Sequence, residues 1–216
     1  MVPWVLASQS PRRQSLLRLF GQAFSVHPAQ IEERLPHSTR TPAKVAKQLA
    51  RAKAEAVAPH YDDALIIAAD TIVVLDGALL GKPGDADDAR RLLRTLSGRT
   101  HTVITALCLL LRQQGQTVQQ VLDAPRSRVT FRTLTEEWIE WYLQTGEPFD
   151  KAGAYGIQEY GALLVERVQG CYFNVVGLPL ATLAHHLEQL VGWRPPVPTP
   201  IGTLTEAEKP FHRRRR

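Results

Sequence analysis

Two arginines follow a serine and a proline near the start of the chain, in the segment LASQSPRR at residues 6–13. Ser10 is a favourable helix N-cap and Pro11 suits the first helical position, so Arg12 and Arg13 fall in the first turn of the expected helix. Backbone N–H groups at a helix N-terminus and guanidinium groups both bind phosphate. We therefore expect a phosphate site here. Two solvated arginines on an exposed turn are the alternative.

Asp70 stands inside the apolar run 65–74, where an acidic residue is out of place. Aspartate is depleted in strands, and burying an unpaired carboxylate costs roughly several kcal/mol. The side chain therefore needs a cation, a metal ion or hydrogen bonds. We interpret Asp70 as a functional carboxylate at a strand bulge or strand end. The alternative is a structural carboxylate satisfied by a nearby lysine or by backbone N–H groups.

Two further segments carry weaker signals for ligand binding. Lys82 lies in the tripeptide Gly-Lys-Pro at 81–83, and a lysine in such a rigid loop suits phosphate. A plain turn lysine is the alternative. The segment DKAGAYGIQ at 150–158 contains two glycines, which let the backbone approach a ligand closely. Its Gln158 amide has donors and an acceptor, enough to read a base edge.

The remaining candidate is the acidic pair Glu32 and Glu33, which could supply a carboxylate to a metal ion, although an adjacent pair of this kind is more often solvated. Cys108 and Cys171 lack the spacing of a zinc site or a disulfide framework and fit a reducing cytosol. The sequence contains no secretory signal pattern and no apolar run near the ~18 residues of a membrane span. We therefore expect a cytoplasmic protein that does not enter a membrane.

The basic charge belongs mainly to the end of the chain. The 216 residues carry a net charge of +5, and residues 193–216 contribute +4 of it, with six lysines and arginines against two acids. We predict one globular domain over 1–192 and a Pro/Arg-rich, disordered tail over 193–216. The terminal arginine run is typical of a solvated terminus, with contact to nucleic acid or an anionic membrane as the alternative.

Strands and helices alternate along the chain, which favours an α/β fold with a mixed sheet. Hydrophobic periodicity and turn residues predict strands over 2–7, 23–27, 64–75, 100–112, 118–133 and 161–168. They predict helices over 11–20, 41–58, 85–96, 135–144 and 175–191. A turn is expected at Asp76-Gly77.

Taken together, the motifs resemble those of the Maf family, over about residues 5–190. The resemblance rests on LASQSPRR (6–13), ADT (69–71), GKP (81–83), LSGRTH (96–101), DKAGAYGIQ (150–158) and NVVGLPL (174–180), in this order. Maf proteins are nucleoside triphosphate pyrophosphatases. The resemblance implies an ITPase-like fold: a mixed twisted sheet flanked by helices, with two lobes around a deep cleft.

The resemblance also assigns roles to individual residues. Asp70 matches the catalytic proton acceptor. The positions that set base specificity are Arg12, Thr71 and Gln158, and those that face phosphate are Ser8, Arg13, Lys53 and Lys82. Glu33 matches a second acidic position, which would bind a divalent cation, Mg²⁺ or Mn²⁺, together with Asp70. The implied reaction cleaves a nucleoside triphosphate between its α- and β-phosphates.

The segment 150–158 looks like that of the family members that act on dTTP and UTP, so the implied substrate is a pyrimidine nucleoside triphosphate. The alternatives are a 7-methyl-GTP type of pyrophosphatase and a nucleic-acid-binding module. The near-neutral charge of residues 1–192 argues against nucleic acid as a partner, and a homodimer is compatible with the sequence. Two positions depart from the family pattern: Glu159 replaces a usual glycine, and Cys171 a usual serine.

Overall fold

The computed structural model describes residues 2–31, 36 and 39–196. Its strands are β1 (Trp4–Leu6), β2 (Phe24–Val26), β3 (Ala64–Leu75), β4 (Ala78–Leu80), β5 (Thr100–Gln113), β6 (Gln116–Asp123), β7 (Arg126–Phe131) and β8 (Val165–Gln169). Its α-helices are α1 (Pro11–Arg18), α2 (Pro42–Val57), α3 (Ala86–Leu96), α4 (Glu136–Gln144), α5 (Tyr172–Val176) and α6 (Leu180–Val191). Short 3₁₀ helices are η1 (Ala58–His60), η2 (Glu147–Asp150), η3 (Ala152–Ala154) and η4 (Glu159–Leu164).

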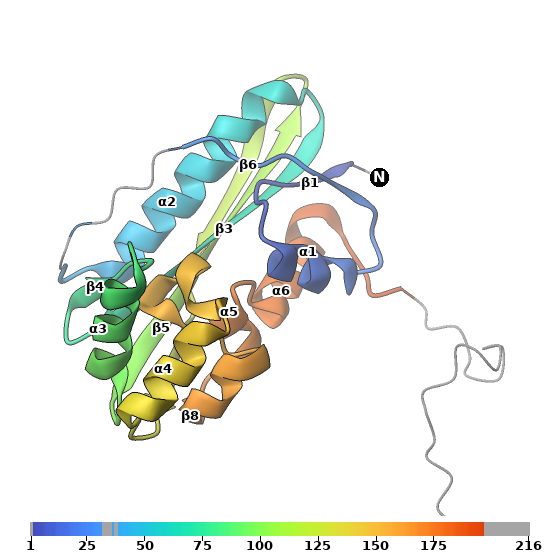
Figure 1. Cartoon of the computed structure of the whole chain (residues 1–216). Coiled ribbons are helices and arrows are strands. Elements are labelled where there is room, and N and C mark those ends of the chain that lie inside the picture. Colours follow the sequence, from blue (N-terminus) through green and yellow to red (C-terminus); the bar gives the residue numbers. More distant parts are fainter. Residues whose placement is uncertain (1, 32–35, 37–38, 197–216) are drawn as a thin grey trace, which may run out of the picture.

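The described strands form one mixed sheet in the order β2-β1-β3-β5-β7-β8, with β4 paired to β3 and β6 to β5. Strand β1 runs parallel to both β2 and β3, and the other pairs are antiparallel. The long strands β3 and β5 form the spine of the molecule in Figure 1. The predicted α/β class with a mixed sheet flanked by helices is confirmed.

Helices cover both faces of this sheet, because successive side chains of a strand point to opposite faces. On one face, Ile66 and Ala68 of β3 belong to a core built with the alanines of α2. On the other face, Leu65 and Ile67 pack in the core that contains residues of α1, α3, α4 and α6. Figure 1 shows α2 along one side of the long strands and α1 and α6 on the other.

Strand β1 lies at a switch point of the chain's winding. From β1 the chain passes through α1 to β2 on one side, and then through α2 to β3 on the other. In open α/β sheets, ligands bind beyond the carboxyl ends of the strands at such a point, because the helices leave a crevice there. The fold therefore indicates a ligand site next to the segment that follows Leu6.

Most predicted elements are present, and β3 has the predicted bounds. The single strand predicted over 118–133 is wrong: β6 and β7 are separate strands that pair with different parts of β5. The break lies at residues 124–125. Pro125 has no N–H to donate to a ladder, which ends regular pairing there.

Two other predicted elements are also divided. The strand predicted over 161–168 begins only at Val165, because residues 159–164 form η4. The helix predicted over 175–191 is interrupted between α5 and α6, where Gly177 adopts a φ of 118° and Pro179 follows it. A positive φ is unfavourable for residues other than glycine and cannot continue an α-helix.

The first residue of the predicted tail is in contact with the domain. Trp193, the first residue of the predicted tail, packs its ring against Phe20 at a centroid distance of 5.0 Å, and its Nε1–H donates to the Phe20 carbonyl. Residues 197–216, with the arginine run, lie outside the described residues.

Among the helices that the structure describes, none has both the length and the apolar character to cross a membrane.

The segment 147–161, which includes the Gly-rich motif, is held by a buried polar cluster. The Gly156 N–H donates to the Tyr142 hydroxyl, and the Gly161 N–H donates to the Glu147 carboxylate at 3.1 Å. Desolvation raises the pKa of Glu147. A Cβ placed on Gly161 would lie 1.9 Å from the Gly156 carbonyl oxygen. The backbone at Gly161 therefore passes Gly156 too closely for any side chain at position 161.

Gly161→Ala should therefore destabilise the protein. The added methyl group has no space to occupy, and overpacking of this kind costs typically about 1–3 kcal/mol or more. Urea unfolding monitored by tryptophan fluorescence measures the change. Gly84→Ala is the matched control, because a Cβ at Gly84 meets nothing within 4 Å. Equal stability of the two variants would contradict the packing described here.

His101 packs against Tyr155 of the same segment, in a buried aromatic cluster. Its Nε2 is 2.7 Å from the Tyr155 hydroxyl, and its ring packs edge-on against Tyr155 and Phe131. The Nδ1 atom has no hydrogen-bond partner in the described part of the chain. Desolvation lowers the pKa of His101 to about 4, so this histidine is neutral in the folded protein at neutral pH.

The free energy of unfolding should fall as the pH is lowered from about 6.5 to about 4. In that window the imidazole binds a proton in the unfolded chain and not in the folded protein, which costs up to about 3 kcal/mol for this shift. Urea unfolding at several pH values measures the slope. His101→Gln should flatten it, since an amide does not titrate, while His185→Gln on the exposed surface of α6 should not. An unchanged slope in His101→Gln would assign the effect to other groups.

Candidate active site

A cavity of about 800 Å³ opens beyond the carboxyl end of β1, between α1, α2, β3 and the segment 150–157. One part of its wall is charged or polar and contains Ser8, Arg13, Lys53, Asp70 and Lys82. Another part is apolar and contains Val73, Val103, Tyr155, Ile157, Val175 and Val176. The cavity thus has the two surfaces that a molecule with a charged end and a flat apolar end requires.

Asp70 and Lys53 form a buried ion pair in the charged part of the cavity. The Lys53 Nζ lies 2.5 Å from the Asp70 Oδ1, and the two side chains are only 10% and 6% exposed. Asp70 points to the face of β3 that α2 covers, and Lys53 is on the α2 surface that packs there. The lysine therefore compensates the carboxylate that the apolar strand would otherwise exclude.

The prediction that Asp70 lies at a strand end or bulge is wrong. Its register with β5 is continuous, and Asp70 pairs with Ala106 in mid-strand. What opens the site is the shortness of the neighbouring strand: β1 pairs with β3 only as far as Leu6 and Ile67. Beyond Ile67, the edge of β3 that β1 leaves unpaired faces the cavity. Asp70 is therefore in the middle of β3 and yet lies beyond the end of β1.

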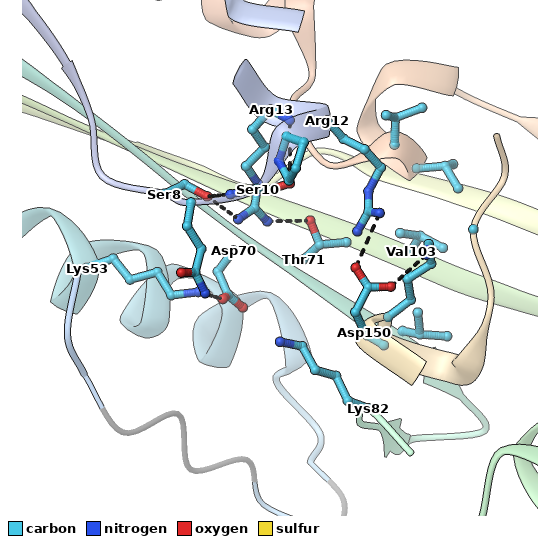
Figure 2. A pocket seen from close by; sticks show the side chains of 18 of the residues that line it. Ser8, Ser10, Arg12, Arg13, Lys53, Asp70, Thr71, Lys82, Val103 and Asp150 are labelled. Atoms are coloured by element: carbon cyan, nitrogen blue, oxygen red, sulfur yellow. Dashed lines mark hydrogen bonds and ion pairs between the residues drawn. The ribbon is translucent and has the colours of Figure 1, made fainter. Parts of the chain in front are cut away.

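Arg13 connects three parts of the chain around the cavity. Its Nε donates to the Gly177 carbonyl at 2.9 Å, one Nη to the Ser8 hydroxyl at 3.2 Å, and the other to the Thr71 hydroxyl at 3.1 Å. Figure 2 shows this guanidinium lying between Ser8 and Thr71. Ser10 caps α1 as predicted, accepting from the Arg13 N–H. The expected first-turn arginine is therefore fixed in one orientation.

Thr71 is oriented by a chain of hydrogen bonds that ends at a buried asparagine. The Thr105 hydroxyl donates to the Asn174 carbonyl at 2.6 Å, so the Thr71 hydroxyl, 2.9 Å away, donates to Thr105 and accepts from Arg13. The fully buried Asn174 amide also donates to Val103 and Ser127. Asp70 and Thr71 are consecutive and face opposite sides of β3, yet both reach the cavity because it wraps around the strand edge.

Arg12 turns away from its neighbour and faces the opposite wall. Its guanidinium lies 3.5 Å from the carboxylate of Asp150. Figure 2 shows these two side chains pointing toward each other beside Val103, away from Lys53 and Asp70. Adjacent residues of a helix differ by about 100° in direction, so the two arginines of one turn serve different parts of the cavity.

The structure thus brings most of the predicted site residues together. Lys82 lies on the cavity wall, and Figure 2 shows its ammonium group extending toward Asp70. Of the predicted residues that the structure describes, Gln158 alone is not among those that line the cavity, although Gly156 and Ile157 are. Glu33 lies outside the described residues. Glu159 has a φ of 55°, a conformation that glycine adopts without strain.

Sequence reasoning assigned no role to several residues that build the site. Asp150 opens the Gly-rich motif and lines the cavity, and its neighbour Lys151 donates to it at 2.6 Å. Asn174 and Thr105 lie on distant segments, and no pattern in the sequence pairs them. In the described ranges, no group of three or more His, Cys, Asp or Glu side chains forms a metal-binding cluster.

Proteins of known name are similar to this chain over most of its length. The dTTP/UTP pyrophosphatase of Syntrophomonas wolfei is 49% identical over 176 residues, which cover 82% of this chain and 91% of that protein. The proteins of the same name from Dictyoglomus thermophilum and Moorella thermoacetica are 47% and 51% identical, covering 86% and 82% of this chain and 95% and 89% of their own.

Among solved structures, a HAM1 protein from Coxiella burnetii is similar with a TM-score of 0.47 and 15% identity, over 88% of this chain and 100% of that one. Residues 3–190 match the family of Maf-like proteins. With that match and with relatives near 50% identity, the chain belongs to the Maf family, as the motifs predicted.

Proposed function

We propose that this chain is a nucleoside triphosphate pyrophosphatase that hydrolyses dTTP and UTP to the monophosphate and pyrophosphate. Relatives of that name at 49% and 47% identity support the assignment. The structural observation that supports the assignment is that the Lys53–Asp70 pair, Arg13 and Lys82 line the same cavity, next to apolar side chains. The triphosphate would occupy the cationic part and the base the apolar part.

The residues of the charged part suit the cleavage of a phosphoanhydride bond. The oxygen of a water molecule attacks the α-phosphorus, the bridging bond to the β-phosphate breaks, and pyrophosphate leaves. Asp70 would take the proton of the attacking water, a role that typically contributes about 10²–10⁴-fold to the rate. Arg13, Lys53 and Lys82 would stabilise the negative charge that develops on the leaving pyrophosphate, and Ser8 would donate to a phosphate oxygen.

A divalent cation fits the oxygen donors of this site. Asp70 provides a carboxylate on the cavity wall, and Mg²⁺ is commonly held by one or two carboxylates together with substrate phosphates. We propose Mg²⁺ or Mn²⁺, with Asp70 and Glu33 as protein ligands. When bound, the ion would neutralise phosphate charge.

Base specificity is proposed to depend on Arg12, Thr71 and Gln158. The apolar surface around Val103 and Ile157 would cover the faces of a planar base. The cytoplasmic location, the homodimer and the division of the chain after residue 192 stay predictions from the sequence.

A substrate panel tests the proposed function. Pyrophosphate release from dTTP, UTP, CTP, ATP, GTP and 7-methyl-GTP is measured with Mg²⁺, with Mn²⁺ and with a chelator. We expect dTTP and UTP to exceed ATP and GTP by at least ~10-fold in kcat/KM, because a site that hydrogen-bonds one base edge leaves its polar groups unpaired with another. The chelator should abolish turnover.

Two results would favour a function other than dTTP and UTP hydrolysis. A clear preference for 7-methyl-GTP would favour the other type of Maf pyrophosphatase. Steeply salt-dependent binding of oligonucleotides, without pyrophosphate release from any triphosphate, would favour the nucleic-acid-binding alternative.

Asp70→Asn should lower kcat at least ~10²-fold, the loss expected when a general base is removed. The amide is nearly isosteric and still accepts a hydrogen bond from Lys53, so the variant should fold, which thermal unfolding verifies. Asp76→Asn is the matched control: Asp76 directly follows the last residue of the same strand, pairs with Arg99 and does not line the cavity. Near-normal turnover of a folded Asp70→Asn protein would remove Asp70 from the role of base.

A further inference from the structure

The cavity contains a carboxylate that the reaction described above does not use. Asp150 of η2 lines the wall opposite α1, with its side chain 65% exposed. One of its oxygens accepts from the Lys151 Nζ at 2.6 Å, and the other lies 3.5 Å from the Arg12 guanidinium. A carboxylate has room for about four hydrogen bonds, so Asp150 can still accept from a bound molecule.

The position of this carboxylate distinguishes it from Asp70. Figure 2 shows Asp150 and Arg12 beside Val103, at the apolar part of the cavity, whereas Lys53 and Asp70 lie across Thr71 from them. Next to the base, the Asp150 carboxylate can accept a hydrogen bond from a ring N–H.

The charge state of Asp150 supports a role as an acceptor. Partial burial by itself raises the pKa of Asp150, but the hydrogen bond from Lys151 and the charges of Lys151 and Arg12 leave it below its ordinary value. The carboxyl group is therefore ionised at neutral pH and only accepts hydrogen bonds, while the Arg12 guanidinium only donates them. Side by side, the two groups present one acceptor and one set of donors.

We propose that Asp150 determines base specificity together with Arg12: its carboxylate accepts from the N3–H of uracil or thymine, and Arg12 donates to the C4 carbonyl. This inference rests on the proposed function. Cytosine presents a lone pair at N3 and an amino group at C4, so it would place acceptor against acceptor and donor against donor. Asp150 would thereby select UTP and dTTP over CTP, which is close to them in size and shape.

The test compares kcat and KM for UTP and CTP in the full-length protein and in Asp150→Asn. An amide both donates and accepts, so it removes the repulsion of the cytosine N3 and weakens the bond to the uracil N3–H. We expect the UTP-to-CTP ratio of kcat/KM to fall at least ~10-fold, as for the loss of one paired base-edge contact. The change should come mainly from a higher KM for UTP.

Asp150→Ala is the second variant: it removes both the acceptor for the uracil N3–H and the repulsion of the cytosine N3, so the UTP-to-CTP ratio should fall there as well. Glu159→Gln is the control: it removes an acid from the same segment at a position that does not line the cavity, and should leave the ratio unchanged. Thermal unfolding verifies that each variant is folded.

An unchanged ratio in both Asp150 variants would overturn the proposal. A loss by one common factor for both nucleotides would also overturn it, because Asp150 would then only hold Arg12 or the segment in place. Both of these results require a wild-type protein that hydrolyses UTP. A wild-type protein that releases no pyrophosphate from UTP would instead refute the proposed function, and this inference with it.

Discussion

The site depends on the ion pair between Lys53 and Asp70. A carboxylate inside an apolar strand is costly, roughly several kcal/mol after relaxation, unless a cation meets it with good geometry. Here α2 packs across the face of β3 toward which Asp70 points and brings Lys53 to 2.5 Å. The same packing fixes one wall of the cavity, so the contact that makes the buried carboxylate tolerable also positions it.

Arg13 provides the second constraint, since it joins α1, β3 and the turn between α5 and α6. Behind it, Thr71, Thr105 and Asn174 form a directed chain of hydrogen bonds whose last member is fully buried. Polar networks of this kind hold their members in one arrangement when every group is satisfied. Arg13 therefore faces the cavity in a fixed orientation.

The cavity combines charged and apolar side chains, which the fold brings from different elements. Lysines from α2 and from the loop after β4 reach it on one side, together with Asp70, and valines from β5 and α5 reach it on the other. Arg12 and Asp150 lie beside the apolar side as a pair of opposite charges.

The order of strands and helices followed from periodicity and turn residues, because local propensity and the pattern of apolar residues suffice for long elements such as β3 and α2. Breaks within elements were harder to predict. The interruption at Gly177 requires a positive φ, and η4 forms where Gly161 passes close to Gly156. The first is a Gly-x-Pro pattern of the local sequence, whereas the second depends on a contact between segments that no local pattern contains.

By itself, the sequence determined the family, the alternation of strands and helices, and the chemical types at the site, because motifs of fixed spacing carry these. Only the tertiary structure decided which of those groups meet. Asp70 is mid-strand and reaches the cavity because β1 stops at Leu6, and Arg12 and Arg13 diverge because a helix turns about 100° per residue. The physical reason is that hydrogen bonds and ion pairs act over a few ångströms in space, whereas the partners are far apart in the chain: Arg12 and Asp150 are separated by 138 positions and meet across the cavity.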